Sequence, residues 1–168
     1  LHWPVPQEVL RPTIHDDLEL DLFEGKAWAS VVGFHLSGLR MRPVRWLPWG
    51  DFDEVNLRTY VKTADGKRGV WFHSLDSTDI FAVLGARILY GLSYRSAKIE
   101  KSLTDQSIAY ESTTNGIFGK IPAKLGAELK ESVGTPKIAR EPLDQFLLER
   151  YRFWARRKAG EQSSFAQI

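Results

Sequence analysis

Alternation of hydrophobic and polar side chains is the strongest pattern in this chain, and it predicts many short β-strands. Residues 18–22 alternate strictly, and apolar side chains recur mostly at every second position over residues 28–36. The segment Glu24-Gly25-Lys26 is able to turn between these two runs. We therefore expect the two runs to pair as a β-hairpin.

A longer hairpin is predicted over residues 55–75, where two runs rich in strand-forming residues flank residues 64–67. The turn contains Asp65-Gly66, and this dipeptide favours the positive φ angles of a type I′ turn. A terminal hairpin is expected to turn near Ala159-Gly160. The remaining strand candidates lie at residues 94–102, 108–113, within 120–132, 151–155 and 163–168.

Three segments have helical features. Residues 6–10 begin with a proline and should form a single turn that Pro12 ends. Short polar side chains at residues 76–79 are able to cap a helix of about three turns that reaches Gly91. We expect this helix to pack against a sheet through Ile80, Phe81, Leu84 and Ile88. Glu141-Pro142 opens another helix, whose face is marked by Leu143, Phe146, Leu147 and Arg150.

The whole pattern predicts one α+β domain over residues 1–168. The chain is 43% hydrophobic, which suffices for one buried core, and no linker or internal repeat divides it. We expect a mostly antiparallel sheet that curls or closes into a barrel, with about two peripheral helices. The chain starts without a methionine and ends on a strand-like run, so we also expect a terminal strand to be missing at one or both ends.

Charge and composition exclude several classes of function. The 23 basic and 21 acidic residues leave a net charge of +2, which is too small for the footprint of a nucleic-acid binder. The longest apolar stretches, such as residues 81–86, fall well below the roughly 20 residues that cross a bilayer. We therefore expect a cytoplasmic protein with neither a nucleic-acid nor a membrane partner. The absence of cysteine excludes disulfides and thiolate chemistry.

Common catalytic and cofactor motifs are missing from the sequence. It contains no phosphate-binding glycine loop, no dinucleotide fingerprint and no His-Glu-x-x-His helix. Residues 91–95 resemble a nucleophile elbow, but Arg95 stands where the tight turn requires glycine. The histidines are scattered singly, so we expect structural roles for His2, His15, His35 and His73. We expect neither a metal nor a cofactor.

One strand carries a row of polar side chains that could form a binding site. Side chains alternate along a strand, so one face of residues 52–61 holds Val55, Leu57 and Val61 and belongs to the core. The opposite face holds Phe52, Glu54, Asn56, Arg58 and Tyr60. This polar row is either a solvated surface, which spacing alone favours, or the wall of a cavity in a closed barrel. In a cavity, an arginine beside a glutamate would orient a ligand that bears a carboxylate.

Several strings closely resemble the YqjF-like proteins, an uncharacterised bacterial family. In chain order they are His2-Trp3-Pro4-Val5-Pro6, Leu20-Asp21-Leu22-Phe23-Glu24-Gly25-Lys26-Ala27-Trp28, Glu54-Val55-Asn56-Leu57-Arg58-Thr59-Tyr60-Val61, Gly69-Val70-Trp71-Phe72-His73-Ser74-Leu75-Asp76 and Phe146-Leu147-Leu148-Glu149-Arg150-Tyr151. The likeness covers nearly the whole chain. This family is distantly similar to acetoacetate decarboxylase, which implies a closed, cone-like β-barrel with a cavity and a few peripheral helices.

The resemblance also bears on the chemistry. Acetoacetate decarboxylase uses a lysine that forms a Schiff base next to a second lysine, after a Gly-aromatic-Pro turn. Tyr94 and Arg95 match those two lysine positions here, so the required amine is missing. Lys98 points to the same side as Tyr94 on a strand, but nothing in the sequence shows that it is desolvated. Glu54 matches a glutamate of the family's cavity wall, which favours the cavity interpretation of the polar row.

Two functions remain open at this point. The first is a small-molecule binding barrel for a carbonyl or carboxylate compound, with Arg58 on the anionic group and Glu54 as an orienting group, acid or base. Asn56, Tyr60 and Tyr94 would complete this site. The second is a non-catalytic structural or interaction module with a filled barrel. In this module Trp46 and Trp49 would form the contact with a partner or with a second copy of the chain in a homodimer. The sequence does not decide whether the protein is an enzyme.

Overall fold

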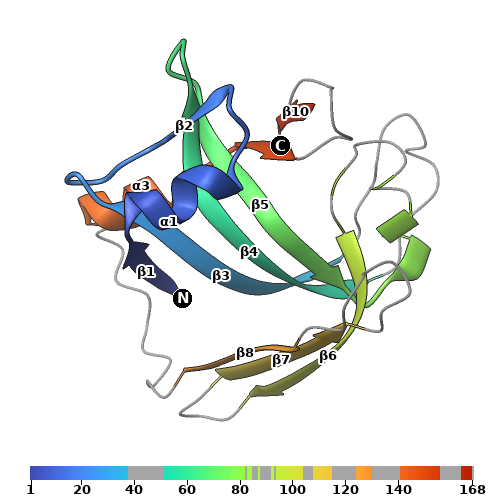
Figure 1. The fold of residues 1–168 in the computed structure, drawn as a ribbon. Helices are drawn as coiled ribbons and strands as arrows, with labels where there is room; N and C mark the ends of the chain where they lie inside the picture. Colours follow the sequence, from blue (N-terminus) through green and yellow to red (C-terminus); the bar gives the residue numbers. More distant parts are fainter. Residues whose placement is uncertain are drawn as a thin grey trace.

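The structure is a computed structural model that describes most of the chain. The described residues are 1–37, 51–81, 83, 84, 87, 92, 94–103, 108–114, 124–129, 141–155 and 164–167. They form one strongly curled sheet of ten strands with short helices beside it (Figure 1). The α+β class and the largely antiparallel sheet are thus confirmed.

Nine of the ten described strands lie in segments where strands were predicted, whereas β1 was not predicted. Their bounds are β1 His2–Val5, β2 Leu18–Leu20, β3 Ala27–Leu36, β4 Phe52–Thr63, β5 Arg68–Ser77, β6 Tyr94–Leu103, β7 Ile108–Thr114, β8 Lys124–Leu129, β9 Arg152–Ala155 and β10 Ser164–Gln167. The main path through the sheet is β1-β3-β4-β5-β6-β7-β8. Most neighbours are antiparallel, but β5 pairs in parallel with both β6 and β9.

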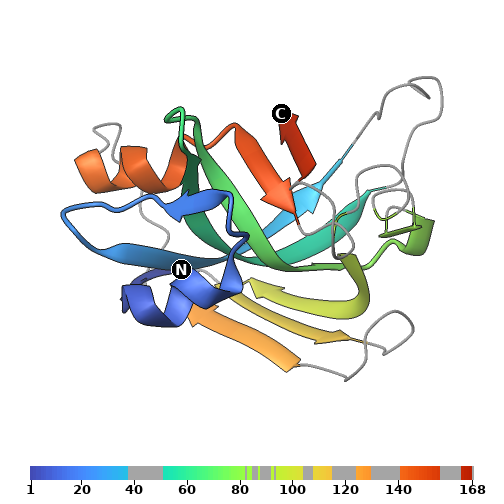
Figure 2. The same cartoon turned by 45° about the horizontal axis from the view of Figure 1, so that its top comes forward.

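The barrel is open, which corrects the expectation of a closed one. Within the part of the chain that the structure describes, β1 and β8 end the strand order and do not pair with each other. The sheet bends between β5 and β6, so that β6, β7 and β8 lie beneath β3, β4 and β5 (Figure 2). Closure depends on pairing between distant strands, and the local alternation of side chains does not encode it.

The long hairpin predicted over residues 55–75 is present as β4 and β5. Gly66 has a φ of 81°, and its amide donates to the carbonyl of Thr63 over 2.8 Å. The predicted type I′ turn is wrong, because that turn needs positive φ at both central residues and Asp65 does not have it. The ladder contains a bulge next to Leu57 and Arg58, because Leu57 pairs with Ser74 whereas Arg58 pairs with Phe72. His73 is therefore the extra residue on β5.

The hairpin predicted from residues 18–22 and 28–36 is wrong. A tight turn does form, in which Phe23 and Lys26 exchange backbone hydrogen bonds of 3.0 Å and Gly25 has a φ of 75°. The strands then separate, since β2 pairs with β4 and β3 lies between β1 and β4. A turn signal and alternation thus located two strands correctly but not their partners.

The described helices lie where they were predicted but differ in their ends. The first is α1, Gln7–Leu10, which continues into a 3-10 turn, η1, over Arg11–Thr13, so Pro12 lies inside a turn and does not end one. Residues 80, 81, 83, 84 and 87 are helical, and the Asp79 carboxylate caps them by accepting from the amide of Phe81 over 2.7 Å. The helix α3 spans Pro142–Leu148 and starts with the capping box of Glu141 and Asp144.

The apolar stripe predicted for the helix after Asp79 is wrong in its described part. Val83 is fully buried, whereas Phe81 keeps 73% of its exposure. Ile80 and Leu84 are exposed as well, and Ile88 lies outside the described residues. Among the described helices, none is long and apolar enough to cross a membrane.

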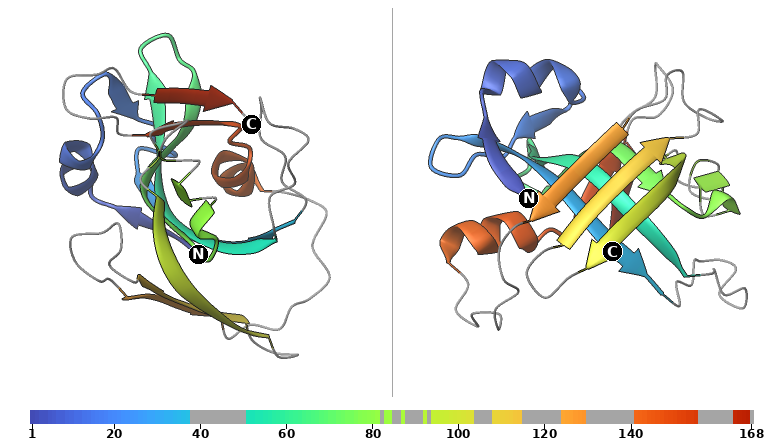
Figure 3. Two further views of the ribbon diagram at one scale, coloured as in Figure 1. Left: turned by 90° about the vertical axis from the view of Figure 1, so that its right-hand side faces the viewer. Right: turned by 90° about the horizontal axis from the view of Figure 1, so that it is seen from below.

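The sheet buries both of its faces. On one face Tyr60 and Val70 pack against Phe146 and Leu147 of α3, and we call this the α3 face. On the other face Val61 and Trp71 pack against residues of the N-terminal segment and β9, and we call this the α1 face. That second cluster consists of Ile14, Leu18, Val61, Trp71 and Trp154. The helices α1 and α3 lie on opposite sides of the sheet (Figure 3, left).

Gly69 is required where β9 crosses close to β5. A Cβ atom at this position would lie 2.4 Å from the carbonyl oxygen of Arg152 and 2.4 Å from the ring of Trp154. We expect Gly69→Ala to lower the free energy of unfolding by about 1–3 kcal/mol, because the β9 backbone must move away. Urea unfolding measures this loss. Lys67→Ala, at an exposed position in the same hairpin, should change stability by less than about 0.5 kcal/mol, and equal effects of the two would refute the close contact.

Candidate ligand-binding site

The polar row predicted on β4 faces α3 and not bulk water. Glu54 and Asn56 retain 3% and 1% of their exposure, and Tyr60 is fully buried. Arg58 is half-buried, and its Nη2 donates to the carbonyl of Leu147 at the end of α3 over 3.4 Å. The register explains the arrangement, because Ser30 and Val32 of β3 lie directly opposite Arg58 and Asn56 and extend the same face.

Glu54 is the centre of a buried hydrogen-bonded group. The hydroxyl of Tyr94, on β6, donates to Oε2 of Glu54 over 2.6 Å, and Nδ2 of Asn56 donates to Oε1 over 3.2 Å. Burial raises the pKa of Glu54, and the carboxylate of Asp76 adds to this effect, against the lowering by the two donors. Burial and the nearby Glu54 also raise the pKa of Tyr94 far above its usual range, so this hydroxyl keeps its proton. The structure thus brings three of the predicted site residues together.

Two atoms of the row lack hydrogen-bond partners. Nε of Arg58 and Oδ1 of Asn56 are buried, and neither has a partner among the described residues. They belong to adjacent positions on the same face of β4. Phe72 and Leu75 lie directly opposite Arg58 and Asn56 on β5 and give this part of the face an apolar border. An unpaired donor and an unpaired acceptor thus lie beside apolar side chains.

Tyr60 belongs to a second chain of hydrogen bonds that sequence reasoning missed. Its hydroxyl lies 2.6 Å from Oγ of Ser30, which in turn lies 2.6 Å from Nδ1 of His2. Burial and the nearby guanidinium of Arg58 lower the pKa of His2. His2 and Ser30 meet because β1 pairs with β3 in this register, and no local pattern signals such a long-range pairing.

Other candidate residues lie away from the row. The side chain of Lys98 is 71% exposed and pairs with Glu100, which raises its pKa, so it is not a desolvated nucleophile. Arg95 binds Asp76, with Nη2 at 2.6 Å from Oδ1. Trp46 and Trp49 fall outside the described residues. Across the described ranges, no three histidine, aspartate or glutamate side chains gather in a way that could hold a metal ion.

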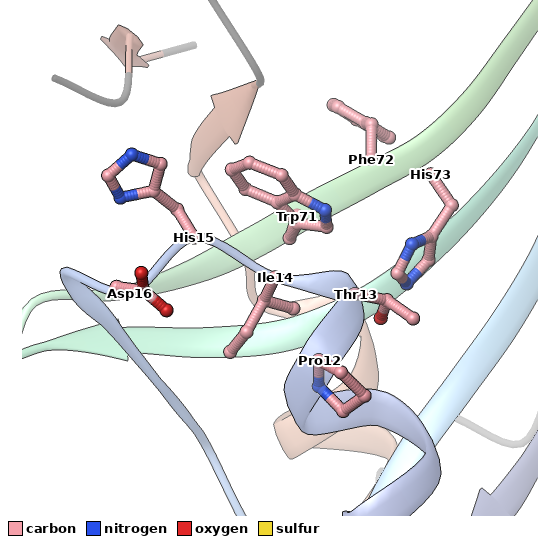
Figure 4. Close-up of a pocket in the computed structure, with 8 residues that line it drawn as sticks. All are labelled: Pro12, Thr13, Ile14, His15, Asp16, Trp71, Phe72 and His73. Atoms are coloured by element: carbon pink, nitrogen blue, oxygen red, sulfur yellow. The ribbon is translucent and has the colours of Figure 1, made fainter. Parts of the chain in front are cut away.

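A cavity lined by described residues lies on the other side of the sheet from the polar row. It has a volume of about 600 Å³ and lies between η1 and the middle of β5 (Figure 4). Its lining residues are Pro12, Thr13, Ile14, His15, Asp16, Trp71, Phe72 and His73. Sequence reasoning missed this cavity, because it depends on how the N-terminal segment packs over the α1 face.

The raised pKa of Glu54 predicts a specific dependence of stability on pH. Above about pH 4.5 the unfolded chain loses this proton while the native state retains it, so native stability falls as the pH rises through this window. Glu54→Gln removes the titration but keeps the shape of the side chain. We expect the variant to gain stability relative to the parent protein from pH 4.5 upward, measured by urea unfolding at each pH. Parallel curves for the two proteins would show that Glu54 titrates normally.

Similarities to known proteins agree with this architecture. Over 162 residues the chain is 36% identical to the uncharacterized protein YqjF of Bacillus subtilis (strain 168). This alignment covers 91% of this chain and 62% of YqjF. The chain therefore spans about three fifths of the length of this curated relative.

Solved structures with a similar fold share little sequence with the chain. Acetoacetate decarboxylase from Legionella pneumophila has a TM-score of 0.55 at 18% identity, covering 92% of this chain and 53% of that one. The enduracididine biosynthesis enzyme MppR, complexed with pyruvate, has a TM-score of 0.62 at 11% identity, covering 96% and 62%. An acetoacetate decarboxylase-like enzyme from Sphingomonas wittichii RW1 has a TM-score of 0.62 at 12% identity, covering 98% and 66%. These structures confirm an acetoacetate decarboxylase-like fold.

A match to a family model covers almost every residue. The model of the DUF2071 family, described as an uncharacterized conserved protein, matches residues 1–167. This match agrees with the resemblance to YqjF-like proteins inferred from the sequence strings. The chain belongs to the DUF2071 family.

Proposed function

We propose that the α3 face of the sheet binds a small molecule that bears a carboxylate or carbonyl group. The observation that carries this proposal is the pair of buried atoms Nε of Arg58 and Oδ1 of Asn56, which have no hydrogen-bond partner in the described part of the chain. A buried polar atom without a partner costs about 1–3 kcal/mol, so a ligand that supplies the missing hydrogen bonds gains this energy.

Each residue of the row has a role in this site. The guanidinium of Arg58 donates from Nε to the ligand carboxylate, in the charge-assisted geometry that arginine favours. Oδ1 of Asn56 accepts a hydrogen bond from a hydroxyl group of the ligand or from a water molecule bound to the ligand. Glu54 and Tyr94 form the polar end of the site, where a carboxyl of raised pKa is able to exchange a proton with a ligand carbonyl.

The chemistry of the site differs from Schiff-base decarboxylation. Tyr94 and Arg95 occupy the positions that the family resemblance assigns to lysines, and Arg95 is engaged by Asp76. The 2-oxo acid class is supported by MppR, a structural neighbour that was solved with pyruvate. We therefore propose binding of a small 2-oxo or 3-oxo acid, without a covalent amine intermediate.

A thermal-shift experiment with Arg58→Leu tests this function. Pyruvate and acetoacetate should raise the melting temperature of the parent protein, because a ligand at 100 times its Kd adds about 2.7 kcal/mol of stability. Loss of one charge-assisted hydrogen bond, about 1.5–3 kcal/mol, should weaken binding by roughly 10- to 150-fold in Arg58→Leu. Acetone, which has no carboxylate, should stabilise neither protein.

Lys62→Leu provides the matched control. Lys62 lies further along β4, is 39% exposed and pairs with Glu19 at the surface. This variant should retain the full response to both acids. If no acid stabilises the parent protein, or if the two variants respond equally, the proposed function is wrong.

The second candidate is a structural or interaction module without a ligand. It is favoured by the apolar cluster of Tyr60, Val70, Phe146 and Leu147, which fills the α3 end of the same face. In that case Arg58→Leu should stabilise the protein, since leucine replaces a partly buried guanidinium with an unpaired Nε. Light scattering on the same samples tests the predicted homodimer.

A further inference from the structure

The cavity on the α1 face has the size and lining of a second binding site. Its volume of about 600 Å³ falls within the roughly 300–1,000 Å³ typical of small-molecule pockets. Trp71, with 3% exposure, and Ile14, with 6%, belong to the core and form an apolar wall. The residues Thr13, His15 and Asp16 bring polar groups to the same cavity (Figure 4).

A bulge in β5 places His73 at this cavity. His73 has no partner in the β4–β5 ladder, because Ser74 pairs with Leu57 and Phe72 pairs with Arg58. Bulges re-aim side chains, and they are common beside functional sites. Here the extra residue adds an imidazole to the lining next to Trp71, whereas the side chain of Phe72 packs in the cluster on the α3 face.

The imidazole of His73 has an unused hydrogen-bonding atom. Its Nε2 is buried and has no partner among the residues that the structure describes. Burial lowers the pKa of His73, so the ring is neutral at neutral pH. A neutral imidazole offers either a donor or an acceptor at Nε2, according to its tautomer. A hydroxyl group satisfies both forms, because it donates as well as accepts.

The polar side chains of Thr13, His15 and Asp16 in the lining already have partners. Nδ1 of His15 lies 3.3 Å from Oδ2 of Asp17, and the hydroxyl of Thr13 donates to the carbonyl of Leu10 over 2.6 Å. The carboxylate of Asp16 is fully exposed at the rim and lies 3.8 Å from Arg11. The described lining therefore offers no cationic side chain to pair with an anionic ligand, and the exposed carboxylate of Asp16 repels such a ligand.

We propose that this cavity binds a small uncharged aromatic molecule with a hydroxyl group, such as a phenol. Its ring packs against the wall of Trp71 and Ile14, where offset or edge-to-face contacts between aromatic rings are favourable. Its hydroxyl reaches the buried Nε2 of His73. This site is separate from the polar row, which lies on the opposite face of the sheet.

Fluorine NMR with 4-fluorophenol tests the inference on the intact chain. The probe should bind saturably, and His73→Phe, which retains a ring of similar size, should weaken its affinity about tenfold, or about 1.4 kcal/mol. Fluorobenzene, which lacks the hydroxyl, should bind about tenfold more weakly than the phenol. 4-Fluorobenzoate, an anion, should not bind at this site.

A second measurement and a control separate this site from the other one. In the unsubstituted protein, the Nε2 resonance of His73 should shift as the phenol is added, which requires no variant that could fail to fold. Arg58→Leu should leave the binding of the phenol unchanged. Absence of saturable binding, an unmoved Nε2 resonance, or equal affinity in His73→Phe would overturn the inference.

Discussion

Replacing Arg150 with methionine is expected to lower the free energy of unfolding by about 3–5 kcal/mol, because it leaves the buried carboxylate of Asp21 without its partner. Nη1 of Arg150 lies 2.6 Å from Oδ2 of Asp21, and the side chains of both residues are only 3% exposed. Nε of Arg68 also lies 3.5 Å from Oδ2 of Asp21, but the Arg68 side chain is 65% exposed, so it compensates only weakly for the loss of the Arg150 charge. Nε of Arg150 further donates to the carbonyl of Phe146 over 2.6 Å and so fixes the end of α3.

A double variant separates the loss of the ion pair from a general loss of packing. Asp21→Leu combined with Arg150→Met removes both charges, and we expect it to recover most of the stability, since apolar residues often replace buried pairs without loss. Arg11→Met, at an exposed position, should have an effect below about 0.5 kcal/mol in the same urea titration. A loss below 1 kcal/mol in Arg150→Met would contradict the burial of this pair.

Asp76→Asn is expected to cost about 3 kcal/mol, at the lower end of the range for a buried ion pair. The Asp76 side chain is fully buried and joins three strands of the sheet. Its Oδ1 accepts from Nε of Arg95 on β6 over 2.7 Å, and its Oδ2 accepts from the hydroxyl of Ser112 on β7 over 2.9 Å. We expect the loss of stability to stay at this lower end because the Arg95 side chain is 25% exposed, so water can solvate its charge when Asp76 is neutralised.

This carboxylate also supports the candidate site. β5 and β6 are paired over only three residues, and Asp76 lies in the middle of that register, between the pairs that contain Tyr94 and Ser96. Asp76→Asn should therefore loosen the position of Tyr94 beside Glu54 as well as destabilise the fold. Asp65→Asn, in the exposed turn of the hairpin, is the matched control and should leave the unfolding midpoint nearly unchanged. Similar unfolding midpoints for the two variants would contradict the role of Asp76.

Local signals in the sequence sufficed for the long hairpin and for the polar row. The hairpin of β4 and β5 follows from Asp65-Gly66 and alternation, both of which act between near neighbours. The common face of Glu54, Asn56, Arg58 and Tyr60 follows from the period of a single strand, whichever strands lie beside it. The hydrogen bond between Tyr94 and Glu54 was not predicted, since 40 residues separate the two positions and no local pattern joins them.

Features that depend on contacts between distant strands were beyond such reasoning. The open edge of the barrel, the pairing of β2 with β4 and the bulge at His73 are set by register across the sheet. The hydrogen bond between Tyr60 and Ser30 likewise requires β3 to lie beside β4 in one register. Among the described residues of the helix after Asp79, Val83 is buried and Phe81 is exposed, because the surrounding fold and not the local apolar stripe selects the packed side.

The Nε–H resonance of Arg58 tests the central claim, that the row on β4 is a site for small carboxylates, most directly. This group is buried and unpartnered among the described residues, so a bound carboxylate must change its environment. In ¹⁵N-resolved NMR spectra recorded during addition of pyruvate or acetoacetate, we predict a saturable shift of this resonance. If both acids leave the Arg58 Nε–H resonance in place up to saturating concentrations, the row is not a carboxylate site.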